Sequence, residues 1–136
     1  MREIKFRAWD KGLKRMIYLS EPTVENDDFS GIVFKLRDYF VSAFSSDRIE
    51  DLELMQYTGL KDKNGREIYE GDIVKTETDY INTGKITEIG VVEFYEEGLV
   101  WIINYGETQI NLAYAENIEV IGNIYENPEL LKEAEK

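Results

Sequence analysis

The stretch KITEIGVVEFYEEGLVWIINYGETQIN, residues 85–111, carries the clearest indication of the fold of this chain. It contains four short runs rich in β-branched and aromatic residues, at 85–89, 91–95, 99–104 and 108–111. Glu97-Gly98 and Tyr105-Gly106 separate the later runs, and glycine gives the backbone the freedom that a tight turn needs. Short runs separated by turn residues are typical of antiparallel strands in a small barrel or sandwich.

Further strands are predicted on both sides of this stretch, at 52–57, 73–76 and 118–125. Between the first two of them, turn residues recur at Thr58-Gly59, Asn64-Gly65 and Glu70-Gly71. Asn64-Gly65 indicates a two-residue type I′ hairpin turn, because both residues tolerate a positive φ. We therefore interpret four residues as structural turn positions: Gly59, Asn64, Gly65 and Gly71.

An alternating pattern occupies the N-terminal residues. Ile4, Phe6 and Ala8 alternate with Lys5, Arg7 and Trp9, which predicts a strand with one apolar and one basic face. Turn residues follow at 10–12, and residues 16–18 can return as the second strand of a hairpin. Residues 19–31 are polar and predict a mobile loop. Residues 32–34 and 39–41 predict strands, with a helix over 33–44 as the alternative.

The last residues have the pattern of a short helix. Asn127 can cap it, Pro128 fits its first position, and Glu129 favours the positive end of the helix dipole. The sequence therefore predicts a helix over 128–136.

The composition favours a folded acidic protein and excludes several kinds of chemistry. Hydrophobic residues make up 43% of the 136 residues, which is enough for a core, and 16 basic against 28 acidic residues give a net charge of -12. Such a charge repels a phosphate backbone, which disfavours non-specific binding of nucleic acid. Cysteine and histidine are absent, which excludes disulfides, zinc sites built from these residues and histidine-based triads.

Charge is unevenly distributed, because residues 1–18 carry +4 and the remainder -16. Within this basic segment, Lys5, Arg7, Trp9 and Lys11 are the candidate binding residues. A basic stripe with an aromatic residue can bind single-stranded nucleic acid by phosphate contact and stacking. The same residues can instead pair with acidic groups of this chain or of a second subunit, or simply face solvent. The sequence leaves these alternatives open.

Acidic residues are dense around Asn64-Gly65, where Asp62, Glu67, Glu70 and Asp72 offer oxygen ligands. The spacing does not fit an EF-hand loop, because glycine comes fourth from Asp62 rather than sixth. Carboxylate pairs elsewhere arise by chance among 28 acidic residues, and the glycine loop that cradles phosphates is missing. We therefore expect no metal, no cofactor, no catalytic residue and no enzymatic activity.

Three blocks, at 2–10, 55–74 and 120–131, together resemble the YopX-like family of phage and prophage proteins. The middle block, MQYTGLKDKNGREIYEGDIV, is long enough to be a specific signal. The resemblance covers most of the chain, with 19–50 and 76–115 as the variable parts. It implies a mainly β protein of a bacteriophage or integrated prophage, and it implies no biochemical activity.

We expect a mainly β fold, a small antiparallel barrel of the SH3-like kind, with α+β as the alternative. An N-terminal β region (1–57), a barrel-like region (58–127) and a C-terminal helix (128–136) would form one compact unit.

The function that we expect is that of a non-enzymatic phage accessory protein in the bacterial cytoplasm. It would act through contacts with a host or phage protein, and the opposite charges of residues 1–18 and the remainder favour self-association. One alternative is an acidic mimic of DNA that occupies a host nucleic-acid-binding protein. Another is binding of single-stranded nucleic acid by the N-terminal strand. We expect no membrane span, because no apolar run approaches the roughly 20 residues of a membrane helix.

Overall fold

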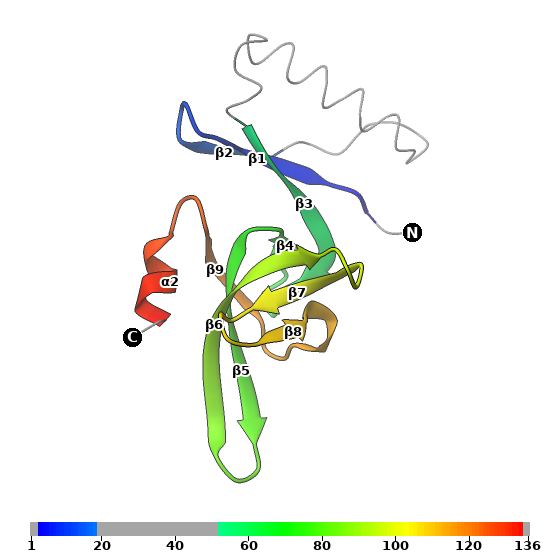
Figure 1. Cartoon of the computed structure of the whole chain (residues 1–136), viewed down its shortest axis with the longest axis vertical. Helices are drawn as coiled ribbons and strands as arrows, with labels where there is room; N and C mark the ends of the chain where they lie inside the picture. The colour runs from blue at the N-terminus through cyan, green and yellow to red at the C-terminus, as the bar shows by residue number, and fades with distance from the viewer. Residues whose placement is uncertain (1–2, 19–51, 135–136) are drawn as a thin grey trace. The chain divides into compact units, whose positions relative to one another are not determined.

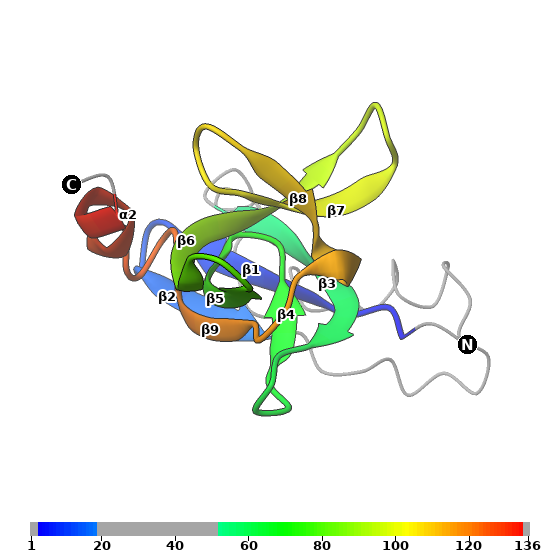
Figure 2. The same cartoon turned by 90° about the horizontal axis from the view of Figure 1, so that it is seen from below.

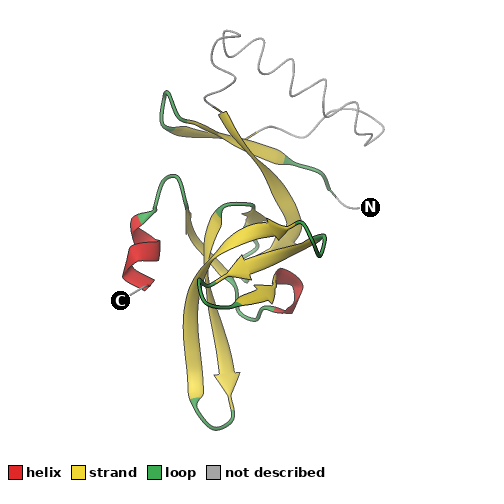
Figure 3. Cartoon of the chain, viewed as in Figure 1, coloured by secondary structure: helices red, strands yellow, loops and turns green. Residues whose placement is uncertain are grey.

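Strands dominate the computed structural model, which describes residues 3–18 and 52–134 (Figures 1 and 3). Within these ranges the strands are β1 (Phe6–Asp10), β2 (Arg15–Tyr18), β3 (Leu52–Lys61), β4 (Glu67–Tyr69), β5 (Asp72–Tyr80), β6 (Gly84–Tyr95), β7 (Val100–Asn104), β8 (Gln109–Asn111) and β9 (Glu119–Asn123). A 3-10 turn, η2 (Leu112–Tyr114), and a short helix, α2 (Glu129–Ala134), complete the described elements. The predictions for 19–31, 32–34, 39–41 and 33–44 lie outside the described residues.

The chain divides into two compact units, Met1–Gln56 and Tyr57–Lys136. In the first unit, β1 pairs antiparallel with β2, with Ala8 opposite Ile17, and with the first half of β3, with Ala8 opposite Leu54. The predicted N-terminal hairpin is therefore confirmed. The Asp10 carboxylate closes its turn by accepting hydrogen bonds from the Gly12 and Leu13 amides at 2.9 and 3.1 Å.

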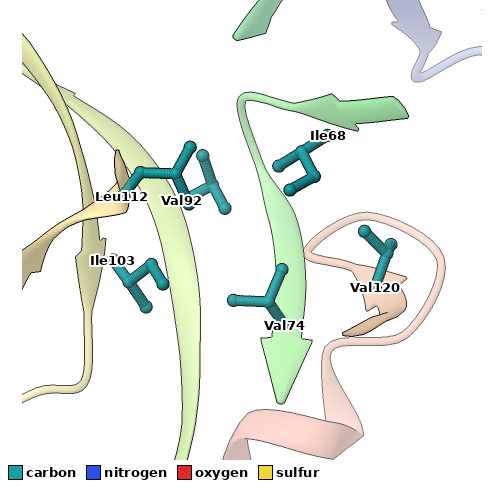
Figure 4. Packing of buried hydrophobic residues seen from close by; sticks show 6 residues of the cluster. All are labelled: Ile68, Val74, Val92, Ile103, Leu112 and Val120. Atoms are coloured by element: carbon teal, nitrogen blue, oxygen red, sulfur yellow. The ribbon is translucent and has the colours of Figure 1, made fainter. Parts of the chain in front are cut away.

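The second unit is built on a curved antiparallel sheet in the order β8-β7-β6-β5-β9, which forms a half-barrel. Its buried core consists of Ile68, Val74, Val92, Ile103, Leu112 and Val120 (Figure 4). These side chains come from six different elements, so burial of apolar surface holds the unit together. The mainly β class with an antiparallel half-barrel and a short C-terminal helix is confirmed, and the closer SH3-like classification stays a prediction.

Strand β6 runs without interruption through Gly90, although the sequence indicated two strands on either side of this residue. A Cβ atom at position 90 would lie 2.7 Å from the Asn104 carbonyl oxygen, 2.7 Å from Cγ2 of Ile103 and 2.9 Å from the Tyr105 ring. The glycine is therefore required by close packing and does not break the strand.

The loop between β3 and β4 differs from the predicted type I′ turn. Gly59, Gly65 and Gly71 have φ of 89°, 83° and 85°, as expected for turn glycines, but Asn64 is not among the residues with positive φ. The reason is Asp62, whose carboxylate accepts from the Asn64 and Arg66 amides, while its carbonyl accepts from the Gly65 amide at 3.0 Å. These bonds hold a longer loop, 62–66, in place of a two-residue turn.

The predicted C-terminal helix is confirmed, but it begins at Glu129, one residue after the predicted start at Pro128, and Asn127 does not cap it with its side chain. The Asn127 side-chain oxygen accepts from the Asn123 amide at 3.2 Å, and its backbone carbonyl accepts from Leu130 at 3.1 Å. Gly122 makes room for this contact, because a Cβ there would lie 2.6 Å from the Asn127 oxygen. Among the described helices, none has the length and apolar character needed to cross a membrane.

Candidate functional site

The basic stripe that the sequence indicated is only partly exposed to solvent. Arg7 is 1% exposed and Ala8 is fully buried, although consecutive strand residues point to opposite faces. Strand β1 is thus covered on both faces at this point, and the expected apolar-in, basic-out arrangement is wrong for Arg7. Lys5 keeps only 18% of its side chain exposed and forms an ion pair with Glu3 at 3.2 Å.

The other two candidate binding residues are also engaged within the chain. Lys11 forms an ion pair with Glu53 at 2.9 Å, and both side chains are about half exposed. Trp9 is half-buried and lies opposite Met16 on β2 and Glu53 on β3. The four residues therefore do not present the continuous cationic surface that phosphate binding requires.

The acidic loop around Asn64 has a structural role that the sequence did not indicate. Asp62 is 7% exposed, and besides its two bonds within the loop its second oxygen accepts from the Val120 amide at 2.9 Å. Burial alone would raise the pKa of this carboxyl. The hydrogen bonds from Val120, Arg66 and Asn64, with the charge of Arg66, outweigh it and lower the pKa. Asp62 therefore fixes the loop to β9 as an ion, and within the described ranges no group of three metal-ligating side chains occurs.

A groove lies beside β6 in the second unit, and a residue of α2 contributes to its lining. Figures 1 and 2 show that α2 lies next to β6. The groove is open to solvent and has a volume of about 850 Å³. Four parts of the chain line it: β6, the end of β7, the turn between β7 and β8, and α2. Their lining residues are Thr87, Glu88, Ile89, Val91, Asn104, Tyr105, Gly106, Glu107, Thr108 and Leu131.

Tyr105 lines the groove, and its side chain is held by two contacts. Its ring packs against Gly90, and its hydroxyl shares a hydrogen bond of 2.8 Å with the buried hydroxyl of Thr76. Burial raises the pKa of this phenol, the Thr76 bond opposes the rise, and the charge of Glu88 adds to it. Tyr105 is therefore a neutral phenol at neutral pH.

One edge of β6 lies open along the groove. The Gly71 amide donates to the Val92 carbonyl, and the Ile124 amide donates to the Gly71 carbonyl. These bonds and the register of the β5–β6 pair show which way the backbone of β6 faces. The N–H and C=O groups of its even-numbered residues point towards β5, and those of its odd-numbered residues point to the opposite side, where β7 lies. Strand β7 ends at Asn104, opposite Val91, so within the described chain no strand pairs with the outer edge at Lys85, Thr87 and Ile89.

The open edge belongs to the β5–β6 hairpin, which extends beyond the neighbouring strands β7 and β9. β9 pairs with β5 only as far as Lys75, and β7 pairs with β6 only from Val91 onwards, so residues 76–80 and 84–88 form a two-stranded ribbon. Figure 1 shows this ribbon extending from the half-barrel. Its tip exposes large apolar side chains, with Ile81 fully exposed and Tyr80 48% exposed.

The second unit and its groove carry an excess of negative charge. Residues 57–136 contain 7 basic and 17 acidic residues, a net charge of -10. Glu88 and Glu107 line the groove, and none of its lining residues is basic. The site can therefore attract cationic groups, bind backbone through the open edge, and pack apolar groups against Ile89, Val91 and Leu131. Sequence reasoning missed it, because it depends on where β7 ends beside β6.

Fold and site together define an acidic, antiparallel half-barrel protein with a groove along an open strand edge. The YopX protein family matches residues 5–132. The chain therefore belongs to the YopX family, as its three sequence blocks indicated.

Two solved structures are similar over almost the whole chain. Protein EF1440 from Enterococcus faecalis shares 26% identity, with 96% of this chain and 99% of that chain covered and a TM-score of 0.57. The protein YopX from Bacillus subtilis shares 22% identity, with 93% and 96% covered and a TM-score of 0.54. No protein with a curated description matches the chain.

Proposed function

We propose that this YopX-family chain is a non-enzymatic accessory protein of a phage or prophage, and that it acts in the bacterial cytoplasm by binding another protein. The observation that carries the proposal is the groove beside β6, which combines an open strand edge with apolar and acidic lining. An open edge and exposed apolar side chains are features that proteins use to hold other chains. The half-barrel supports a binding module of the SH3-like kind.

The partner that fits this surface is basic. The second unit carries a net charge of -10, so it attracts a positively charged surface and speeds the encounter with it. A nucleic-acid-binding protein of the host presents such a surface. The charge distribution therefore favours, as a second candidate function, an acidic mimic that occupies the nucleic-acid site of such a protein.

Direct binding of single-stranded nucleic acid is less favoured than protein binding, since Arg7 is buried and Lys5 and Lys11 form ion pairs. Self-association through Lys5 and Lys11 is less favoured for the same reason, because both form ion pairs within the chain. Self-association through another surface stays a prediction.

Site-specific photo-crosslinking tests the proposed function. A crosslinking amino acid replaces Thr108 at the groove, and in a matched control it replaces Tyr114, which is 76% exposed and lies outside the groove. In cells that carry the gene, we expect position 108 to capture a defined protein, in the presence of nuclease, and position 114 not to capture it. Charge reversal by Glu88→Lys with Glu107→Lys should abolish the product. Equal capture at both positions, or a product that nuclease removes, contradicts a protein-binding groove.

A further inference from the structure

We propose, on the basis of the proposed function, that the groove binds its partner as an extended segment that adds one strand to the open edge of β6. The segment carries lysine or arginine side chains that alternate with apolar ones. Three features of the second unit lead to this ligand: the direction of the backbone groups of β6, the sides on which its side chains lie, and the charge of the groove.

In the part of the chain that the structure describes, the backbone of β6 before Val91 pairs with another strand on one side only, the side of β5. Lys85, Thr87 and Ile89 each direct one N–H and one C=O away from β5, and within the described residues no strand accepts them. β7 occupies the same side of β6 from Val91 onwards. An added segment therefore continues the line of β7, and five residues of it span about 17 Å at roughly 3.3 Å per residue.

The side chains of β6 specify an alternating ligand. Thr87, Ile89 and Val91 lie on one face of the sheet, and Glu88 lies on the other face. Residues directly opposite one another in neighbouring strands have their side chains on the same face. Segment residues opposite Thr87 and Ile89 thus meet apolar surface, whereas those next to Glu88 meet a carboxylate.

The charge of the site selects a basic segment over a second copy of this chain. A second copy would bring another second unit with a net charge of -10 to a groove lined by Glu88 and Glu107. Like charges brought together at an interface oppose association, whereas opposite charges favour it. The half-buried Tyr105 ring adds a surface over which a lysine or arginine can form a cation–π contact.

An acetylated and amidated octapeptide that alternates lysine or arginine with valine serves as the probe for the full-length protein. Amide hydrogen exchange is measured by NMR with and without it. In the free protein we expect the Thr87 and Ile89 amides to exchange at least tenfold faster than the Glu88 amide, which faces β5. The peptide should slow exchange at Thr87 and Ile89 at least tenfold and leave Glu88 unchanged. No binding, or binding without this protection, overturns strand addition.

Two peptides of equal charge separate strand addition from general attraction between opposite charges. The segment lies antiparallel to β6, as β7 does, so N-methylation at the valines removes the donors that would face β6, and N-methylation at the basic residues removes the donors on the far side. We expect the first peptide to lose at least tenfold in affinity by fluorescence anisotropy and the second to bind within threefold of the parent. Equal binding of both overturns the proposal.

Matched variants test the same contact from the side of the protein. Thr87→Pro removes the amide that faces the groove, and Thr87→Val retains it with a similar shape. We expect only the proline variant to lose at least tenfold in affinity. Protection of Thr87 and Ile89 that grows with protein concentration in the absence of peptide would reveal a second copy on the edge and overturn the proposed ligand. A crosslinked protein without edge protection refutes strand addition alone, whereas failed crosslinking refutes the proposed function.

Discussion

Replacing Asp62 by alanine tests the polar group that fixes the loop 62–66 to β9. Its carboxylate accepts three backbone hydrogen bonds of 2.9 Å, from Asn64, Arg66 and Val120. Val120 is 6% exposed, so in the variant its amide would remain buried without an acceptor, which costs about 1–3 kcal/mol. Asn64 and Arg66 are exposed and water can replace their bonds, so we add about 1 kcal/mol for both. The expected loss is about 2–4 kcal/mol.

Urea unfolding followed by tryptophan fluorescence measures this loss, because Trp101 packs against the core of the second unit. Asp79→Ala provides the control, since Asp79 is an exposed acidic residue on the ribbon and its loss should change the free energy of unfolding by no more than about 0.5 kcal/mol. A loss below about 1 kcal/mol for Asp62→Ala would refute the reasoning, because water would then satisfy the Val120 amide.

The pH dependence of the same variant gives a second measurement. The pKa of Asp62 is lowered in the folded state from its ordinary value of 3.8, by the bonds that outweigh its burial. Its contribution is therefore fully present above about pH 4 and is lost as the pH falls through the lower folded value. The stability difference between the natural protein and Asp62→Ala should shrink below pH 3.8. A difference that stays constant down to pH 2 would show that the ionised carboxylate is not what holds the loop.

Three further changes test the packing. Gly90→Ala should destabilise the protein by about 1–3 kcal/mol in urea unfolding, because its Cβ would meet backbone and core atoms at 2.7 Å; an unchanged midpoint would contradict this. Arg7→Glu should cost about 3 kcal/mol or more by burying an opposite charge, whereas the exposed Lys14→Glu should cost little, and equal effects would show that Arg7 is accessible. Tyr105→Phe should cost about 1 kcal/mol by removing the bond to buried Thr76. Since burial raises the pKa of Tyr105, the natural protein should lose this contribution as the pH rises above 10, and the variant should not.

Local patterns were sufficient for the positions of most strands and for the turn glycines, because alternation and positive φ are properties of neighbouring residues. They could not show that Arg7 is buried, since a strand covered on both faces depends on what pairs with it and covers it. Asp62 illustrates the same limit, because its decisive partner, Val120, is 58 residues away. The open edge of β6 depends on the lengths of β6 and β7 relative to each other. The length of the β5–β6 hairpin was the nearest signal, and Gly90 concealed it by suggesting two short strands.

The acidic residues around the ribbon account for how an open edge can persist. A two-stranded ribbon is only marginally stable alone, and an unpaired edge invites pairing with another copy of the same chain. Glu77 and Asp79 on β5 and Glu88 on β6 oppose such pairing, because two copies would bring these like charges together. The same charges do not oppose a basic segment, and they draw one towards the groove. One distribution of charge thus opposes pairing of two copies at this edge and favours the basic ligand that we propose.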